Sequence, residues 1–330
     1  MMRVRLPILA GAAALASGCG PLSILAADGP GAAAIAHLWW WLFWGTIIPT
    51  IFVLGFLAYA VYRGRAARQV SDAPASRDIT IILAIGAVMP LLVILMLMVQ
   101  SFRTGQRTTE PPELPRTRVE IVAHMFWWEV RYPDLGVVTA NELHIPAGES
   151  TMLELTSADV IHSFWVPALH GKIDTIPGRV NIFWLHPDRP GEYRGVCAEF
   201  CGVQHALMGF LVVAQPRDAF DAWIAERRRA AVAPADGLAA RGQQAFELGG
   251  CQHCHAVGGI FEPRVENTGP DLTHLGSRRT LAAATVPNTA ENLRAFIRNP
   301  HVRKPGVRMP ATPLGDDDLD ALVVFLQGLR

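Results

Sequence analysis

Four side chains that can bind metals lie within one twelve-residue stretch of this sequence. The stretch, residues 197–208, reads Cys-Ala-Glu-Phe-Cys-Gly-Val-Gln-His-Ala-Leu-Met. Thiolate, imidazole and thioether ligands together suit copper that cycles between Cu(I) and Cu(II). Cys197 and Cys201 can both bridge two copper ions, with His205 on one ion and Met208 and a backbone carbonyl as weak outer ligands. The stretch therefore predicts a binuclear copper centre.

Such a centre needs a second histidine for the second copper ion. The best candidate is His162, in Asp-Val-Ile-His-Ser-Phe-Trp, at the end of a strand-like run. Three other interpretations stay open: a disulfide between Cys197 and Cys201, a tetrahedral zinc site, and a His162 that only packs in a core. Neither the disulfide nor the zinc site needs a methionine three residues after the last histidine.

A second motif, Cys-Gln-His-Cys-His at residues 251–255, is the attachment pattern of c-type haem. In this pattern Cys251 and Cys254 form thioethers to the haem vinyl groups and His255 ligates the iron. The pentapeptide alone could also bind zinc or arise by chance. It follows a helix-like run at 237–248, however, and the chain looks exported, which is where haem attachment takes place.

Haem iron held in this way needs a sixth ligand. Met309 is the only methionine after the attachment motif, and a thioether ligand would raise the reduction potential into the range of an electron carrier. His274 and His301 are the alternative ligands. We expect Met309 to bind the iron.

The composition indicates a membrane protein of two or three domains. The chain has 330 residues, of which 51% are hydrophobic, and its formal net charge is zero. A net charge of zero argues against nucleic acid as a partner, because nucleic-acid-binding domains usually carry a basic patch. The five cysteines fall into three separate groups along the chain, which does not suggest a disulfide framework.

The first 19 residues have the form of a signal peptide, with a basic start, a short apolar run and small residues. Ala16-Ser17-Gly18 precede Cys19, as at a bacterial lipoprotein processing site, where Cys19 would be lipidated. An ordinary signal sequence or an uncleaved anchor is the alternative.

Two apolar segments, 37–62 and 79–100, are each long enough to cross a hydrocarbon core. The connector between them carries more arginine than acidic residues, so it is expected in the cytoplasm, with both ends of the chain outside. The segments therefore predict a transmembrane hairpin.

From residue 105 to 232 the pattern changes to short β-rich runs separated by Pro and Gly turns, closed by an amphipathic run at 218–232. Many short strands predict a sandwich or barrel, with residues 197–208 in a loop between two strands and His162 in a neighbouring loop. The expected strands are 119–123, 126–132, 142–145, 151–156, 180–185, 193–196 and 209–214.

The sequence resembles subunit II of haem-copper cytochrome c oxidases in the order of its features. These are the two spans, the β-domain, Asp-Val-Ile-His-Ser-Phe at 159–164, Ile-Pro-Gly-Arg at 176–179 and the stretch at 197–208. The resemblance implies a cupredoxin-like fold. It also implies a CuA centre and its ligands: His162, Cys197, Glu199 through its backbone carbonyl, Cys201, His205 and Met208. In that family the side chain matching Glu199 also helps to bind magnesium at the interface with subunit I.

Residues 236–330 resemble class I cytochrome c, with Asn-Thr-Gly-Pro-Asp-Leu at 267–272, a helix-like run at 290–298, Met309-Pro310 and a final helix at 316–329. The expected architecture is multidomain: a two-helix transmembrane hairpin, an all-β cupredoxin-like sandwich or barrel and an all-α class I cytochrome c domain.

The two resemblances together imply the electron-input subunit of a caa3-type oxidase in a bacterial inner membrane, with the copper and haem domains on the outer side. Haem c would receive electrons from cytochrome c or a quinol:cytochrome c reductase and pass them through copper to subunit I. Neither span carries the histidines that oxygen reduction needs, so that chemistry is expected in subunit I, with subunit III as a further partner.

Family members usually have Trp at the start of the aromatic run where electrons enter, whereas this chain has Phe126-Trp127-Trp128. These three residues are the candidates for electron entry. Two other functions stay open: the electron-input subunit of a CuA-containing nitric oxide reductase, and a membrane-tethered copper-binding or copper-delivery protein. A delivery protein does not need haem, so the fused cytochrome speaks against the second.

Overall fold

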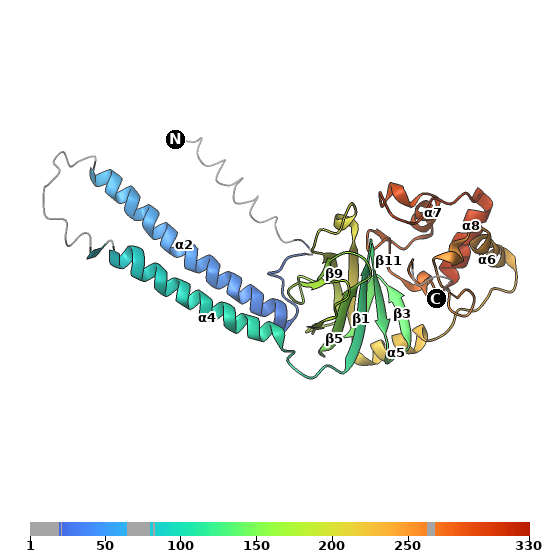
Figure 1. Ribbon diagram of the computed structural model, residues 1–330, viewed down its shortest axis with the longest axis horizontal. Coiled ribbons are helices and arrows are strands. Elements are labelled where there is room, and N and C mark those ends of the chain that lie inside the picture. The colour runs from blue at the N-terminus through green and yellow to red at the C-terminus, as the bar shows by residue number, and fades with distance from the viewer. Residues whose placement is uncertain (1–19, 21, 65–79, 82, 263–267) are drawn as a thin grey trace, which may run out of the picture. The chain divides into compact units, whose positions relative to one another are not determined.

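The computed structural model describes residue 20 and residues 22–64, 80–81, 83–262 and 268–330 (Figure 1). The chain divides into two compact units, one of residues 1–32 and 111–330 and the other of residues 33–110. The expected signal peptide with Cys19 and the connector at 65–79 lie outside the described residues.

Two long apolar helices form the smaller unit. Helix α2 spans Pro30–Gly64, and a π-helical turn, η1 (Ala84–Val88), leads into α4 (Met89–Thr109). Both helices are long and apolar enough to cross a membrane, and large side chains such as Phe52 are exposed along them. Helix α2 extends beyond the expected 37–62 at both ends, and α4 continues past the expected end at residue 100, because helical hydrogen bonding continues through the less apolar residues there.

The β-domain consists of two five-stranded sheets, with strand orders β3-β2-β1-β5-β8 and β4-β10-β9-β6-β7. The strands are β1 (Thr117–His124), β2 (Trp127–Tyr132), β3 (Val137–Ala140), β4 (Glu142–Pro146), β5 (Thr151–Ser157), β6 (His162–Trp165), β7 (Ile173–Thr175), β8 (Asn181–Leu185), β9 (Gly191–Cys197) and β10 (Gly209–Gln215). Buried residues of both sheets, such as Ile121 and Val212, form one core. The expected sandwich is confirmed.

Three short strands of the β-domain, β3, β6 and β7, were not expected from the sequence. His162 was placed at the end of a strand-like run and in a loop, and this is wrong: it is the first residue of β6 and pairs with Thr175 of β7. The alternation of apolar and polar residues that identifies a strand is hard to recognise in three or four residues.

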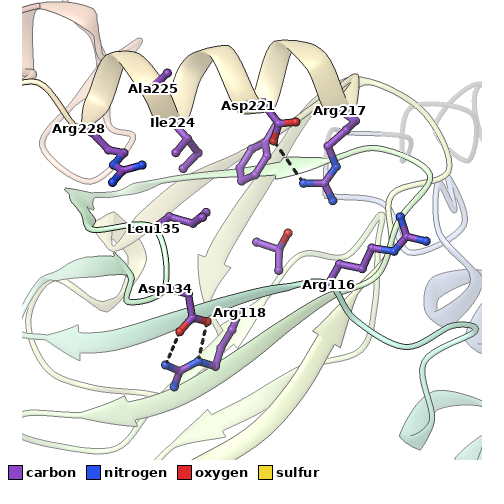
Figure 2. Close-up of a pocket in the computed structure, with 11 residues that line it drawn as sticks. Arg116, Arg118, Asp134, Leu135, Arg217, Asp221, Ile224, Ala225 and Arg228 are labelled. Atoms are coloured by element: carbon purple, nitrogen blue, oxygen red, sulfur yellow. Dashed lines mark hydrogen bonds and ion pairs between the residues drawn. The ribbon is translucent and has the colours of Figure 1, made fainter.

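Helix α5 (Arg217–Arg227) closes the sandwich and buries Phe220 and Ile224 in its core. It ends five residues before the expected limit at residue 232. Beside α5 lies a cavity of about 250 Å³, where Arg118 and Asp134 form an ion pair, as do Arg217 and Asp221 (Figure 2).

The haem domain, residues 236–330, is built around helices α6 (Gly237–Leu248), α7 (Ala290–Arg298) and α8 (Asp316–Gly328). Its short elements are η3 (Cys251–His253), η4 (Leu275–Ser277), β11 (Thr280–Leu281), β12 (Val286–Pro287) and η5 (Pro300–Val302). A Cβ atom at Gly242 of α6 would lie 2.0 Å from the carbonyl oxygen of Ala321 of α8, so glycine allows this close helix crossing. All three expected helices are present, with differences of one residue at most.

Tyr132 braces the sandwich between its two sheets. Its buried hydroxyl donates to the carbonyl oxygen of His144 and accepts from the His144 N–H, each at 2.8 Å. One side chain on β2 thus satisfies both backbone groups of a residue on β4 of the other sheet.

We predict that Tyr132→Phe lowers the free energy of unfolding of the β-domain by about 1–3 kcal/mol, because two buried backbone groups lose their partner. Urea unfolding followed by tryptophan fluorescence measures the change. Tyr193→Phe is the control, since that hydroxyl bonds one carbonyl oxygen, of Arg189, and the variant should unfold at nearly the wild-type urea concentration. Equal effects of the two substitutions would contradict the bracing role.

Candidate metal and haem sites

The two cysteine sulfurs of the ligand loop, residues 197–208, lie 3.8 Å apart and are both free. A disulfide would bring them to about 2.05 Å. Cys197, at the end of β9, and Cys201 are both buried. The structure therefore has two neighbouring thiols here and not the alternative disulfide.

The other expected ligands surround this sulfur pair. Nδ1 of His162 lies 4.0 Å from the Cys197 sulfur, and Nδ1 of His205 lies 3.9 Å from the Cys201 sulfur. The Met208 sulfur is 3.9 Å from Cys201, and the Glu199 carbonyl oxygen is 3.2 Å from Cys197. Each imidazole thus faces one sulfur. This donor set fits two copper ions bridged by the thiolates better than one tetrahedral zinc ion, because it offers six ligand atoms in place of four.

Asp159 orients the fully buried ring of His162. Its Oδ1 lies 2.8 Å from Nε2 of His162, which leaves Nδ1 directed at the sulfurs. The carboxylate also accepts the N–H groups of Met125 and Val160, each at 2.7 Å. A carboxylate that fixes the far nitrogen is the usual partner of a metal-binding histidine.

Hydrogen bonds within the site favour loss of the proton from one sulfur of the pair. The contact between the two sulfurs lowers the pKa of Cys197 and raises that of Cys201. Burial alone would lower the pKa of His162, but Asp159 and Cys197 together raise it. Copper binds the thiolate form of cysteine, so the protons of this cluster would leave when metal enters.

Backbone contacts hold the ligand loop in shape. The N–H of Cys197 donates to the Met208 carbonyl at 3.0 Å, and Nε1 of Trp128 donates to the same oxygen at 3.4 Å. Gly202 has φ +129°, a conformation that side-chain-bearing residues rarely adopt, and a Cβ atom there would lie 3.2 Å from the ring of Phe126. These contacts tie the two ends of the loop to each other and to β2.

The three candidate electron-entry residues have different environments. Trp128 is fully buried, with its ring centroid 6.1 Å from that of His162. Phe126 is also buried. Trp127 is half-buried and stacks on His124 at 4.3 Å, so it alone of the three reaches solvent.

The haem-attachment motif lies at the turn after α6, and both of its cysteines are free thiols. Nδ1 of His255 donates to the Pro270 carbonyl at 2.7 Å, which leaves Nε2 for iron. A Cβ atom at Gly269 would lie 2.7 Å from Cε1 of His255, so only glycine leaves room for the ring in this position. The residues fit the expected role of His255 as an axial ligand.

The three candidate sixth ligands have different environments. His274 is buried, and its Nε2 donates to the carbonyl of Arg227, at the end of α5, at 3.0 Å. His301 is exposed. Met309 packs, partly buried, against the haem-domain core.

Sequence reasoning missed several residues that support the copper ligands. Asp159 could have been recognised from the sequence, since it lies three residues before His162 in the motif Asp-Val-Ile-His-Ser-Phe. Gln204, Glu142 and Lys304 had none, because they act through contacts between the β-domain and the haem domain, far apart in the sequence.

Residues 135–215 match the family described as cytochrome C oxidase subunit II, periplasmic domain, and residues 239–330 match cytochrome c. A probable cytochrome c oxidase subunit 2 from Rickettsia bellii is 30% identical over 202 residues, which cover 55% of this chain and 74% of that protein. The chain belongs to the cytochrome c oxidase subunit 2 family.

A cytochrome c oxidase subunit 2 from Alkalihalophilus pseudofirmus is 43% identical over 213 residues, 64% of this chain. The chain spans about three fifths of the length of this curated relative. The periplasmic domain of subunit II of cytochrome oxidase from Bradyrhizobium japonicum is similar over 35% of this chain and 96% of its own, with 27% identity and a TM-score of 0.34. The subunit II family implies CuA, and the cytochrome c match implies haem.

We predict that Asp159→Asn weakens copper retention by roughly 10–100-fold, because the amide no longer holds His162 by its charge. Titration of the purified chain with a copper chelator measures the loss. Asp174→Asn is the matched control, since Asp174 is an exposed residue on β7 beside the strand that His162 begins. Equal copper retention in both variants would exclude the orienting role.

We predict that Met309→Ala changes the visible spectrum of the haem and lowers its reduction potential, since a thioether ligand raises the potential. Potentiometric titration of the full chain reads both properties. His274→Ala and His301→Ala serve as controls and should leave the spectrum unchanged. A spectrum altered by either of these and not by Met309→Ala would move the sixth ligand to that histidine.

Proposed function

We propose that this protein is the electron-input subunit of a caa3-type terminal haem-copper oxidase. Electrons from an external donor would pass through haem c and CuA to the oxygen-reducing subunit I. The observation that carries the proposal is one compact unit holding both a six-atom copper ligand set and a haem-attachment motif with an oriented histidine.

When bound, haem c and the copper pair each take up and release one electron at a time. The chain's own residues supply rigidity: Asp159 fixes His162, and Trp128 holds the carbonyl of Met208. Ligands held in place by such contacts keep the metal geometry the same in both oxidation states, which favours fast electron transfer. Tethering the haem domain to the copper domain also removes the need for a diffusional encounter between these two domains.

The remaining features belong to the same proposal. The exposed side chain of Glu199 would complete a magnesium site with subunit I, while its carbonyl serves copper. Subunit I would carry out the oxygen chemistry, with subunit III as a further partner. The helices α2 and α4 would anchor the chain in a bacterial inner membrane, with both domains outside and a lipid on Cys19.

The proposal is tested by Cys201→Ser in the full chain. We expect the electron paramagnetic resonance signal of two coupled copper ions to disappear while covalent haem is retained, because one bridging thiolate is lost. Cys254→Ser is the reciprocal control and should weaken haem attachment while keeping the copper signal. Two coupled copper ions in the Cys201 variant would overturn the assignment.

The large subunit that co-purifies separates the oxidase from a nitric oxide reductase with the same copper ligands. We expect the purified complex to consume oxygen when it is supplied with a reduced cytochrome. Reduction of nitric oxide without consumption of oxygen would favour the reductase.

A further inference from the structure

The β-domain and the haem domain, both within one compact unit, share a dense set of polar contacts. These contacts converge on two places in the haem domain: the hairpin of β11 and β12, and the loop around Lys304. We call them the hairpin anchor and the lysine anchor. Neither belongs to the copper or haem ligands.

The hairpin anchor depends on a buried carboxylate. Glu142 on β4 is 3% exposed, and its Oε1 accepts the N–H groups of Arg279 and Thr280 at 2.7 and 3.0 Å and the Thr280 hydroxyl at 3.3 Å. Within the β-domain it has His144 at 3.8 Å. A buried carboxylate of the β-domain is therefore hydrogen-bonded mainly by the haem domain, as expected of a built interface and not of a chance contact.

The turn between β11 and β12 also contacts the β-domain, at β9 and β10. The Ala283 carbonyl accepts a hydrogen bond from the N–H of Gly209 at 3.1 Å, and the Ala284 carbonyl accepts one from Nη1 of Arg194 at 3.1 Å. Ala282, Ala283 and Ala284 all have φ between +54° and +57°. Three successive alanines in the left-handed region are costly, and such a backbone persists where its surroundings fix it.

The lysine anchor carries a buried ammonium group. Lys304 is 2% exposed, and its Nζ donates to the carbonyl oxygens of Phe126 at 2.9 Å and Leu207 at 3.2 Å. In return, Nε2 of the buried Gln204 donates to the carbonyl oxygens of Lys304 and Pro305, each at 2.8 Å. A buried cation is retained where fixed oxygens replace its water, as these do.

The two anchors grip the loop that supplies copper ligands. Gln204, Leu207 and Gly209 are neighbours in sequence of the ligands His205 and Met208. Lys304 of the lysine anchor also donates a hydrogen bond to the backbone carbonyl of Phe126. Phe126 is the first residue of the aromatic run that the family resemblance connects with electron entry. The surface at Phe126 is thus taken by the chain's own haem domain.

We propose that Glu142 and Lys304 keep the haem domain permanently docked on the copper ligand loop, so that the surface at Phe126 is closed to any diffusible electron carrier. An external electron-donor protein then docks on the haem domain, residues 236–330. This inference rests on the proposed function for its electron path, whereas the docking itself is a property of the folded chain.

Hydrogen exchange with mass spectrometry on the full, metal-loaded chain tests the docking. In the wild type, amides 279–285 are expected to be protected. Glu142→Ala should speed their exchange by about tenfold or more, since local opening sets the exchange rate. Glu192→Ala is the matched control, because Glu192 pairs with Arg279 at 2.8 Å at an exposed position, and it should leave exchange unchanged. Wild-type exchange in the Glu142 variant would overturn the hairpin anchor.

Lys304→Met tests the second anchor, since it removes the ammonium and keeps the length of the side chain. We expect faster exchange at residues 204–208 and easier hydroxyl-radical labelling of Phe126. Phe200, which is 77% exposed, provides the internal reference for labelling. Unchanged labelling of Phe126 relative to Phe200 would overturn the lysine anchor. Because Glu142→Gln and Lys304→Met keep the side-chain shape, the pair still tests both anchors if Glu142→Ala does not fold.

The site of the external donor is mapped by adding a soluble, reduced c-type cytochrome to the full chain. Protection confined to residues 236–330 is the expected result. Protection at residues 124–129 would overturn the closed surface. Copper and haem spectra of the same samples test the proposed function separately, so loss of the metal signals with intact protection would overturn the function and leave the docking in place.

Discussion

Two cysteine sulfurs held 3.8 Å apart without a bond between them are the constraint on which the rest of the structure depends. Free thiols at this distance oxidise readily unless metal binds them or the backbone keeps them apart. Here Cys197 ends β9 and faces His162 on β6, while the buried Met208 lies beside Cys201. The sandwich thus serves as a rigid frame for a loop that could not keep this geometry alone.

The haem domain completes that frame. Its hairpin and its loop around Lys304 contact the ligand loop on either side of His205 and Met208, so the two redox sites share supporting contacts. Burying the charged side chain of Lys304 costs free energy, and burial lowers its pKa to about 7. Fixed carbonyl oxygens compensate for the lost water only when the haem domain is in place. Docking of the haem domain and ordering of the ligand loop therefore depend on the same contacts.

The sequence predicted the metal chemistry better than the supporting contacts. Cysteine, histidine and methionine at fixed spacing in one loop limit the possible ligands, so residues 197–208 and 251–255 could be interpreted without a structure. His162 was identified but misplaced, since a four-residue strand such as β6 has too few residues to show alternation. Glu142 and Lys304 could not be predicted, because a buried charge is recognised only through its partners, which lie more than 90 residues away in the chain.

The central claim is that the thiols of Cys197 and Cys201 bridge two copper ions beside one covalent haem. Elemental analysis of the purified full chain, combined with electron paramagnetic resonance, tests it most directly. The account predicts two copper ions for each haem iron, with one unpaired electron shared over both copper nuclei. Zinc in place of copper, or a disulfide between Cys197 and Cys201, would contradict it.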